Sequence, residues 1–273
     1  MKNVVLTILS VLLCCACQFD NKQVAEMANF FSSQVDSAAA QANVEQSFNA
    51  FEIPITNPGV PSKLLVRTGY AVSYNSNWRI PNWVAYELTA QEARGRLRRE
   101  GTFEPDYDIG YNGADNGDYK GSGYSRGHMA PAGDMKWSGR AMRESFLHTN
   151  ICPQDFDLNA GQWEDLESAL RDCAHRWGSV YIVCGPVVDK GYETIGRHRV
   201  CVPQRFFKVV CWKSSGQWHC KAFVFPNRKL SGRFHDYSTT VDNVERLTGH
   251  DFFSQLPDNI ENGIESRDNR GRW

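Results

Sequence analysis

One segment of this chain has clear helical periodicity, whereas the other apolar segments are typical of strands. Between Leu158 and Trp177, apolar side chains recur at spacings of three and four residues, as in an amphipathic helix. Gly178 follows, where such a helix commonly ends. The flanking apolar segments lack the regular strand–helix alternation of a parallel sheet. The sequence therefore predicts an α+β fold with a central, largely antiparallel sheet flanked by helices.

The expected strands are rich in β-branched and aromatic residues. They are Lys63–Tyr74, Trp83–Leu88, Val180–Cys184, Phe206–Trp212 and Trp218–Phe225. A helix is expected at 241–248 and a short helix or an ordered loop at 142–148. A loop rich in glycine, proline, aspartate and asparagine is expected at 103–124. With 273 residues, of which 41% are apolar, the chain can bury a substantial core.

The first 17 residues have the features of an export signal. Lys2 supplies a positive start, and a nearly unbroken apolar run follows from Val4 to Cys17, too short for a stable membrane span. The run ends in Cys-Cys-Ala-Cys, which resembles a bacterial lipobox with Cys17 as the lipidated residue, although Cys14 stands where leucine is usual. Cleavage without a lipid is the alternative. We therefore expect export to a bacterial periplasm or cell envelope, with the membrane as a partner through Cys17.

Composition divides the chain into four parts. The export segment, 1–17, is followed by a tether at 18–48 that is rich in Gln, Ala, Asn and Ser. We expect one domain at 49–258 and a polar tail at 259–273.

Cysteine usage is consistent with an oxidising compartment. Nine cysteines are present, and three of them lie in the export segment, which leaves the six at positions 152, 173, 184, 201, 211 and 220. An even number permits disulfides. A hairpin centred on Ser215-Gly216 would place Cys211 opposite Cys220, so we predict that this pair forms a disulfide. The six contain no CxxC pair, and a zinc site is therefore not expected.

Net charge does not by itself indicate a nucleic-acid partner. The formal net charge is −1, whereas nucleic-acid-binding proteins often carry a basic face. A local cluster can still provide such a face, and Arg94, Arg96, Arg98 and Arg99 form one. A solvated helix face is the alternative interpretation of the cluster.

Residues 125–134, with the sequence SRGHMAPAGD, combine side chains suited to phosphodiester chemistry. His128 can accept a proton near neutral pH. Arg126 can bind a phosphate, and Gly127 lets the backbone approach a ligand closely. The proline and glycines that follow cannot belong to a helix interior.

The predicted helix from Leu158 carries a second polar set. On a regular α-helix, Asn159 and Glu167 lie about 80° apart around the axis and ~12 Å apart along it. One asparagine oxygen with waters suits Mg²⁺, which keeps much of its hydration shell, better than Ca²⁺. The alternatives are a helix N-cap for Asn159 and a simple i,i+4 ion pair between Glu167 and Arg171.

Together these segments resemble the DNA/RNA non-specific endonucleases, a family that includes endonuclease G and has a ββα-metal active site. The resemblance rests on three blocks in the same order and spacing: RGHMAPAGD at 126–134, TNICPQ at 149–154, and LNxxxWxxLExxxR at 158–171. It extends over about residues 51–253 through further blocks at 81–88, 99–106, 183–186 and 202–208.

The resemblance implies a role for each matching residue. His128 would be the general base that takes a proton from the attacking water. Asn159 would be the sole direct protein ligand of a Mg²⁺ ion, with Mn²⁺ as a possible substitute, and Glu167 would orient the waters of that ion. Arg99 would stabilise the negative charge that develops on the phosphate. Arg126 and Arg171 would contact phosphate or support the site, and Asn150 would orient the site or contact substrate.

One position departs from the family pattern, because Ser125 stands where the family has aspartate. Serine keeps a hydrogen-bonding group and loses a charge, so we expect activity with an altered rate or metal preference.

The expected function is an exported, Mg²⁺-dependent endonuclease that hydrolyses DNA and RNA with little sequence preference, since phosphate contacts carry no sequence information. Two alternatives are left open. A catalytically inactive homologue would bind nucleic acid in a salt-sensitive way without cleaving it. A phosphodiesterase for small diesters would turn over such substrates and degrade long polynucleotides poorly.

Overall fold

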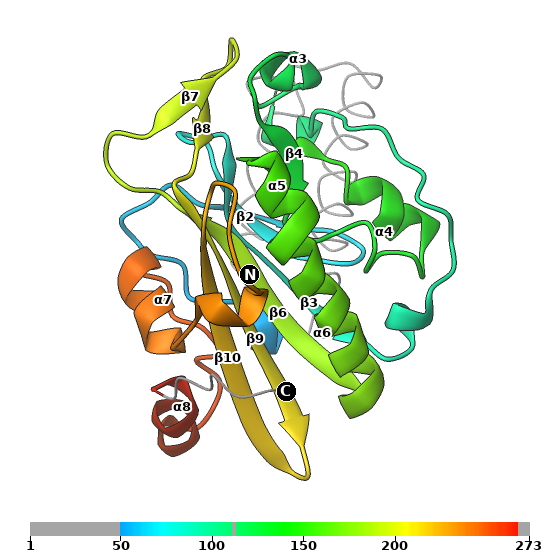
Figure 1. The fold of residues 1–273 in the computed structure, drawn as a ribbon, viewed down its shortest axis with the longest axis vertical. Helices are drawn as coiled ribbons and strands as arrows, with labels where there is room; N and C mark the ends of the chain where they lie inside the picture. Colours follow the sequence, from blue (N-terminus) through cyan, green and yellow to red (C-terminus); the bar gives the residue numbers. More distant parts are fainter. Residues whose placement is uncertain (1–49, 111–112, 267–273) are drawn as a thin grey trace, which may run out of the picture. The chain divides into compact units, whose positions relative to one another are not determined.

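The computed structural model of this chain describes residues 50–110 and 113–266. Its largest element is a seven-stranded sheet in the order β1-β2-β3-β6-β9-β10-β11, with every neighbouring pair antiparallel (Figure 1). The strands are β1 Lys63–Val66, β2 Ala71–Asn75, β3 Ile80–Thr89, β6 Ser179–Val187, β9 Arg205–Ser214, β10 Gln217–Pro226 and β11 Ser238–Thr239. The predicted α+β class with a central antiparallel sheet is confirmed.

Two further strand pairs and several helices complete the described part of the chain. The pairs are β4 Ser125–His128 with β5 Ile151–Gln154, and β7 Glu193–Ile195 with β8 Val200–Val202. The helices are α3 Asn116–Tyr119, α4 Gly139–Glu144, α5 Phe156–Leu158, α6 Glu164–Trp177, α7 Val241–Thr248 and α8 Asp258–Glu265. A π-helical turn, Asn159–Trp163, joins α5 to α6, and short 3₁₀ segments lie at 50–52, 92–94, 107–109, 148–150 and 234–237.

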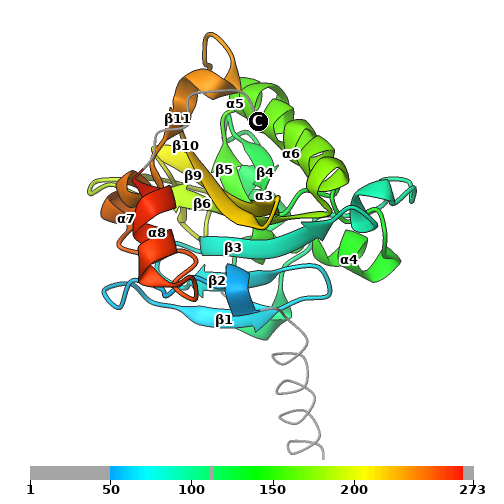
Figure 2. The same ribbon diagram turned by 90° about the horizontal axis from the view of Figure 1, so that it is seen from below.

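Side chains of β9 alternate between two buried layers. Trp212 belongs to the layer beneath α6, where its ring stacks on Trp177 with 4.6 Å between centroids. Phe207 faces the opposite side and packs at 5.5 Å from Phe252. Helix α6 therefore covers one face of the sheet, and α7 and α8 lie at the other (Figure 2). Because both faces are covered, the central strands are almost continuously apolar.

The β9–β10 hairpin has the predicted register. Ser215 and Gly216 both have positive φ, 50° and 80°, as a two-residue type I′ turn requires. Cys211 and Cys220 lie directly opposite each other, and their Sγ atoms are 2.8 Å apart as free thiols. The register is thus confirmed, and the disulfide between these two residues stays a prediction.

Several boundaries differ from the sequence expectations, and the helix expected near 142–148 is α4, Gly139–Glu144. The strand expected at 63–74 is broken into β1 and β2 by a turn at 67–70, in which the Arg67 amide donates to the Tyr70 carbonyl at 2.8 Å. Residues 259–265, expected within a polar tail, lie in α8, because the partly buried Ile260 and Ile264 recur at helical spacing on a helix that contacts β10. Residues 1–49 and 267–273, with the expected export segment and tether, lie outside the described residues. Within 50–110 and 113–266, no helix is long and apolar enough to cross a bilayer.

Candidate active site

His128 is the last residue of β4, where it pairs with Ile151 of β5. The rings of Phe103 and Phe146 lie against the imidazole, with centroid distances of 5.2 and 5.0 Å. The side chain is only 8% exposed, and Nε2 has no hydrogen-bond partner. Burial, with a smaller contribution from the positive charge of Arg99, lowers the pKa of His128 from 6.5 to about 3. The imidazole is therefore neutral at pH 7 and can accept a proton.

Asn150 fixes the loop that follows His128. Its side-chain oxygen accepts from the Ala130 amide at 2.8 Å, and its side-chain nitrogen donates to the carbonyls of Ala130 and Ser145 at 2.9 and 2.8 Å. The residue is fully buried. The expectation that Asn150 contacts substrate is therefore wrong, because its amide is occupied by backbone groups beneath the site. Orienting the loop is the role its contacts allow.

The helix that carries Asn159 begins earlier than its apolar periodicity indicates. Asp155 caps α5, and its side chain accepts from the Leu158 amide. The N-cap alternative for Asn159 is therefore wrong. Asn159 instead opens the π-helical turn, and Gly161 within that turn has φ −117° and ψ −117°, outside the helical region. The half-buried Asn159 side chain makes no hydrogen bond within residues 50–110 and 113–266.

The π turn changes the relation between Asn159 and Glu167. On a regular α-helix these residues would lie about 80° apart around the axis. One extra residue in an unkinked helix would leave about seven α-helical steps between them and an angle of ~20°. The non-helical backbone of Gly161 adds a kink to this turn. Asn159 and Glu167 border the same cavity.

That cavity, which we call the His128 cavity, has a volume of about 630 Å³. Six of the seven residues that the sequence singled out line it: Arg99, Arg126, His128, Asn159, Glu167 and Arg171. The seventh, Asn150, lies beneath the site, where it bonds the backbone of the loop that follows His128. Strand β4, the helix starting at α5 and the segment that carries Arg99 thus bring together residues that are up to 72 positions apart (Figure 1).

Two arginines lie over the rings that hold His128. The Arg126 guanidinium carbon is 4.6 Å from the centroid of Phe103, and Arg126 also donates to Asn116 Oδ1 at 2.9 Å. The exposed Arg99 lies over Phe146 at 5.6 Å. Each phenylalanine therefore contacts the imidazole and an arginine, and cation–π attraction favours this arrangement. Positive charge is placed next to a neutral base.

Buried ion pairs support the helical side of the cavity. Arg171 donates to Asp134 at 2.8 Å, and Asp134 also accepts from the Tyr86 hydroxyl at 2.9 Å. The expected alternative, a simple Glu167–Arg171 pair, is not the arrangement present, since the ion pair of Glu167 is with Lys208 at 3.4 Å. Burial raises the pKa of Glu167 to about 7, although the Lys208 charge opposes this shift.

Lys208 is the site residue that sequence reasoning missed. It is fully buried in β9, and its Nζ lies 4.0 Å from the centroid of the Trp163 ring as well as near Glu167. The signal was available, because Lys208 occupies one position in an alternating row whose other members, Phe206, Val210 and Trp212, are apolar. A lysine in such a row must have a buried partner.

The donor set of the His128 cavity fits a strongly hydrated divalent cation. Asn159 offers one free amide oxygen, and the carboxylate of Glu167 borders the same space. Within the described ranges, the groups of three or more potential ligands lie elsewhere, at Asp115–Asp118–His198 and Asp242–Glu245–Glu265. An ion held mainly by water and one or two protein oxygens matches Mg²⁺ better than Ca²⁺ or Zn²⁺.

An antiparallel strand pair whose first strand ends in a histidine, followed by a helix carrying asparagine and glutamate, is the arrangement of the ββα-metal nucleases. Residues 49–259 match the family model for DNA/RNA non-specific endonuclease. The chain therefore belongs to the DNA/RNA non-specific endonuclease family, whose members are hydrolytic, metal-dependent enzymes.

Individual relatives agree with this assignment. The chain is 35% identical over 259 residues to the human mitochondrial nuclease EXOG, which covers 88% of this chain and 68% of that protein. It is 34% identical over 216 residues to a nuclease of Nostoc sp., which covers 75% of this chain and 78% of that protein. A chain from the crystal structure of the EndoG/EndoGI complex superposes with a TM-score of 0.69 at 30% identity and covers 74% of this chain and 91% of that chain.

Proposed function

We propose that this protein is an exported, Mg²⁺-dependent nuclease that hydrolyses phosphodiester bonds in DNA and RNA with little sequence specificity. The observation that supports this proposal most strongly is that His128, whose Nε2 has no hydrogen-bond partner, and Asn159 line one cavity that arginines also line. A base, a cation ligand and phosphate-binding charges are the parts that phosphodiester hydrolysis needs.

In this proposal His128 takes the proton from the water that attacks phosphorus. Phe103 and Phe146 fix the ring, and burial keeps it neutral. A pKa of about 3 makes the free imidazole a weak base. A phosphate bound beside it would stabilise the imidazolium and raise that pKa, so that proton acceptance becomes favourable when substrate is present.

Asn159 would hold the Mg²⁺ ion through its amide oxygen. The bound ion would stabilise negative charge on the phosphate and on the leaving oxygen. Glu167 would accept hydrogen bonds from the surrounding waters, and Lys208 with Trp163 would keep its carboxylate in place. Arg99 and Arg126 would bind the phosphate from the opposite side of the cavity. Arg171, held by Asp134, would contribute positive charge from the helix.

Ser125 is compatible with activity in this proposal. Its hydroxyl donates to the Gln154 carbonyl at 2.7 Å and so links β4 to β5. The residue contributes to the position of the strand that ends in His128, and a hydroxyl can make this link without the charge of the family's aspartate.

Incubation of the purified protein with plasmid DNA and with RNA, in Mg²⁺ and in EDTA, tests the proposal. We expect both polymers to be degraded in Mg²⁺ and to stay intact in EDTA. Salt-sensitive binding without cleavage would contradict the proposal and favour an inactive homologue. Turnover of bis(4-nitrophenyl) phosphate without degradation of either polymer would contradict it in favour of a small-diester hydrolase.

We also propose that residues 1–17 direct export and that Cys17 carries a lipid. The support is the sequence pattern alone, with Lys2, the apolar run and the cysteine after a small residue. Mass spectrometry of the mature N-terminus from bacterial membranes tests this, with a diacylglyceryl-modified Cys17 as the expected product. A mature protein cleaved elsewhere and without lipid would contradict it.

A further inference from the structure

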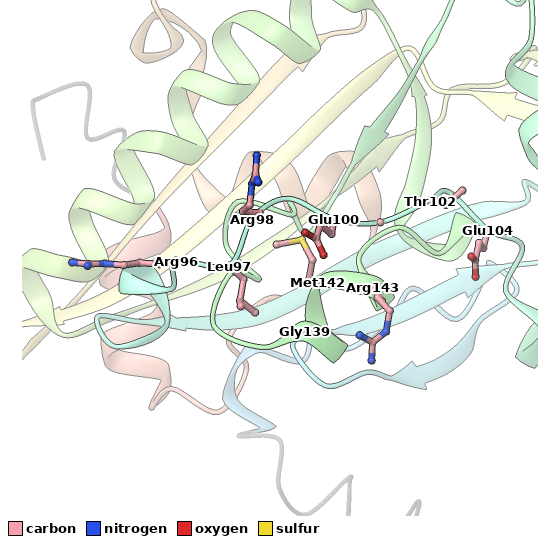
Figure 3. Close-up of a pocket in the computed structure, with 10 residues that line it drawn as sticks. Arg96, Leu97, Arg98, Glu100, Thr102, Glu104, Gly139, Met142 and Arg143 are labelled. Carbon is pink, nitrogen blue, oxygen red and sulfur yellow. The ribbon is translucent and has the colours of Figure 1, made fainter.

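A second cavity, of about 610 Å³, adjoins the His128 cavity and has no role in the mechanism above. We call it the Arg96 cavity, and the residues that matter here are Arg96, Leu97, Arg98, Glu100, Met142 and Arg143. Figure 3 shows Arg96 and Arg98 projecting in different directions from one chain segment, and Arg143 extending from α4.

The two cavities lie on either side of residues 95–101. Gly95 and Arg99 border the His128 cavity, whereas Arg96 and Arg98 border the Arg96 cavity. Neighbouring residues of this short segment thus line both cavities. A ligand that extends out of the His128 cavity across this segment therefore meets the Arg96 cavity.

This segment is fixed rather than loosely attached. A Cβ at Gly95 would collide with the backbone of Lys136, and one at Gly101 would collide with the Phe146 ring. Between them, the Leu97 amide donates to the Lys136 carbonyl at 3.1 Å. Because Phe146 also packs against His128, the position of the segment 95–101 depends on that of the proposed base.

The Arg96 cavity has the chemistry of a phosphate-binding surface with an apolar patch. Arg96, Arg98 and Arg143 are all exposed, and none of them forms an ion pair with another residue in the described parts of the chain. Leu97 between the first two is 45% exposed. Glu100 and Glu104 also line the cavity and reduce its positive charge.

We propose that the Arg96 cavity binds the nucleic-acid strand on one side of the scissile phosphate. This inference rests on the function proposed above. A polynucleotide held at His128 must continue out of that cavity. The adjoining segment 95–101 presents guanidinium groups without ion-pair partners, which suit phosphates, and an apolar side chain that suits a sugar or base. Arg96 and Arg98 bind flanking phosphates, and Leu97 packs between them.

The double variant Arg96→Gln/Arg98→Gln tests the proposal. Binding of labelled single strands of 4 and 20 nucleotides is measured by fluorescence anisotropy in EDTA, which prevents cleavage, and KM for the 20-mer is measured in Mg²⁺. We expect about 10-fold weaker binding of the 20-mer and a salt dependence reduced by about 1.4 in log–log slope, for two lost phosphate contacts. Affinity for the 4-mer and turnover of bis(4-nitrophenyl) phosphate should stay unchanged.

Two further variants make the result specific. Arg199→Gln/Arg246→Gln removes the same charge from exposed arginines that line neither cavity, and should bind the 20-mer like the wild type. Glu100→Gln/Glu104→Gln removes negative charge from the Arg96 cavity and should bind the 20-mer more tightly, a gain that misfolding cannot produce.

Equal Kd, KM and salt slope in Arg96→Gln/Arg98→Gln and its charge-matched control would overturn the proposal. An equal loss on the 20-mer and on the small diester would also overturn it, since the arginines would then act through the His128 cavity. A wild-type protein that cleaves no polymer refutes the proposed function, whereas a wild type that cleaves and a double variant that matches its control refute only the strand contact.

Discussion

At the scale of single residues, the site depends on side chains that lack partners in a buried setting. His128 Nε2 is buried without a hydrogen bond. The half-buried Asn159 side chain makes none within residues 50–110 and 113–266. Leaving such groups unpaired costs stability, so their presence indicates a ligand that satisfies them when it binds. Asn150 and Asp134 beside them are paired, whereas His148 and Gln154 also have buried polar atoms without a hydrogen-bond partner.

Replacing Asn159 by alanine should remove the protein's only direct contact to the proposed cation. We expect at least about a 100-fold loss of Mg²⁺-dependent cleavage, because Asn159 is the direct ligand in this proposal and Glu167 contacts the ion only through water. A Mg²⁺ titration of plasmid cleavage measures this. Gln162→Ala is the matched control, since Gln162 lies in the same π turn but donates to the Gly232 carbonyl. An unchanged titration curve for Asn159→Ala would contradict the ligand assignment.

The residues that act on substrate could be predicted from sequence, whereas those that support them could not. His128, Asn159 and Glu167 stand in short, ordered motifs. Lys208 lies 41 positions beyond Glu167, and only the stacking of β9 beneath α6 brings the two together. Asn150 lies in one of these motifs, but its burial depends on the folding of the loop at 129–150, which no local pattern indicates.

At the scale of elements, the π turn at 159–163 sets the orientation of Asn159 relative to Glu167 on α6. On a regular helix Asn159 and Glu167 would lie about 80° apart around the axis, and the extra residue of the π turn reduces this angle. Apolar periodicity could not reveal this, because the pattern from Trp163 to Trp177 is the same with or without an inserted residue before it. Gly161 was the available signal, since glycine inside a helix often has a special reason.

Deleting Ala160 tests the turn as an element. Ala160 is exposed, so its removal creates no cavity in the core. The π turn should become a regular α turn, which would rotate Asn159 by about 100° relative to Glu167. We expect cleavage to fall as far as in Asn159→Ala while the thermal unfolding midpoint, followed by circular dichroism, does not fall.

Ala160→Ser keeps the residue count and should stay active, which makes it the control for the deletion. Full activity after deletion would show that the register between Asn159 and Glu167 is unimportant.

At the scale of the whole molecule, buried histidines and buried glutamates change the free energy of unfolding with pH in opposite directions. Burial lowers the pKa of His128 to about 3 and the pKa values of His148 and His250 to about 4, from 6.5. Below pH 6.5 the unfolded chain takes up protons that the folded chain does not. Stability is therefore lost as pH falls from 6.5 toward 3 to 4.

The glutamates act in the other direction. Burial raises the pKa of Glu52 and Glu167 from 4.5 to about 7 and that of Glu265 to about 8. Their contribution is fully present below pH 4.5 and is lost as pH rises toward 7 to 8, because the folded chain then keeps protons that the unfolded chain has released.

The two sets together predict a plateau. Between pH 4.5 and 6.5 they oppose each other, so the free energy of unfolding should be nearly level, with losses below pH 4.5 and between pH 6.5 and 8. Urea denaturation in EDTA across this range measures it. A stability that rises steadily to pH 8 would contradict the burial of the three glutamates.

The fold class followed from sequence because strand and helix periods differ and because both faces of the central strands are apolar. The sequence did not predict which helix covers which face of the sheet. That α6 packs on the Trp212 side of β9, and α8 against β10, depends on contacts between distant segments. The Arg96 cavity has the same origin, since it forms only where residues 96–104 meet α4.

Cleavage of a labelled DNA and a labelled RNA by wild-type and His128→Ala protein tests the central claim most directly, with His219→Ala, a histidine on the far part of β10, as control. The account predicts metal-dependent cleavage of both polymers by the wild type and the control, and a loss of about 10²- to 10⁴-fold in His128→Ala with an unchanged circular dichroism spectrum. Cleavage by folded His128→Ala at the wild-type rate would contradict it.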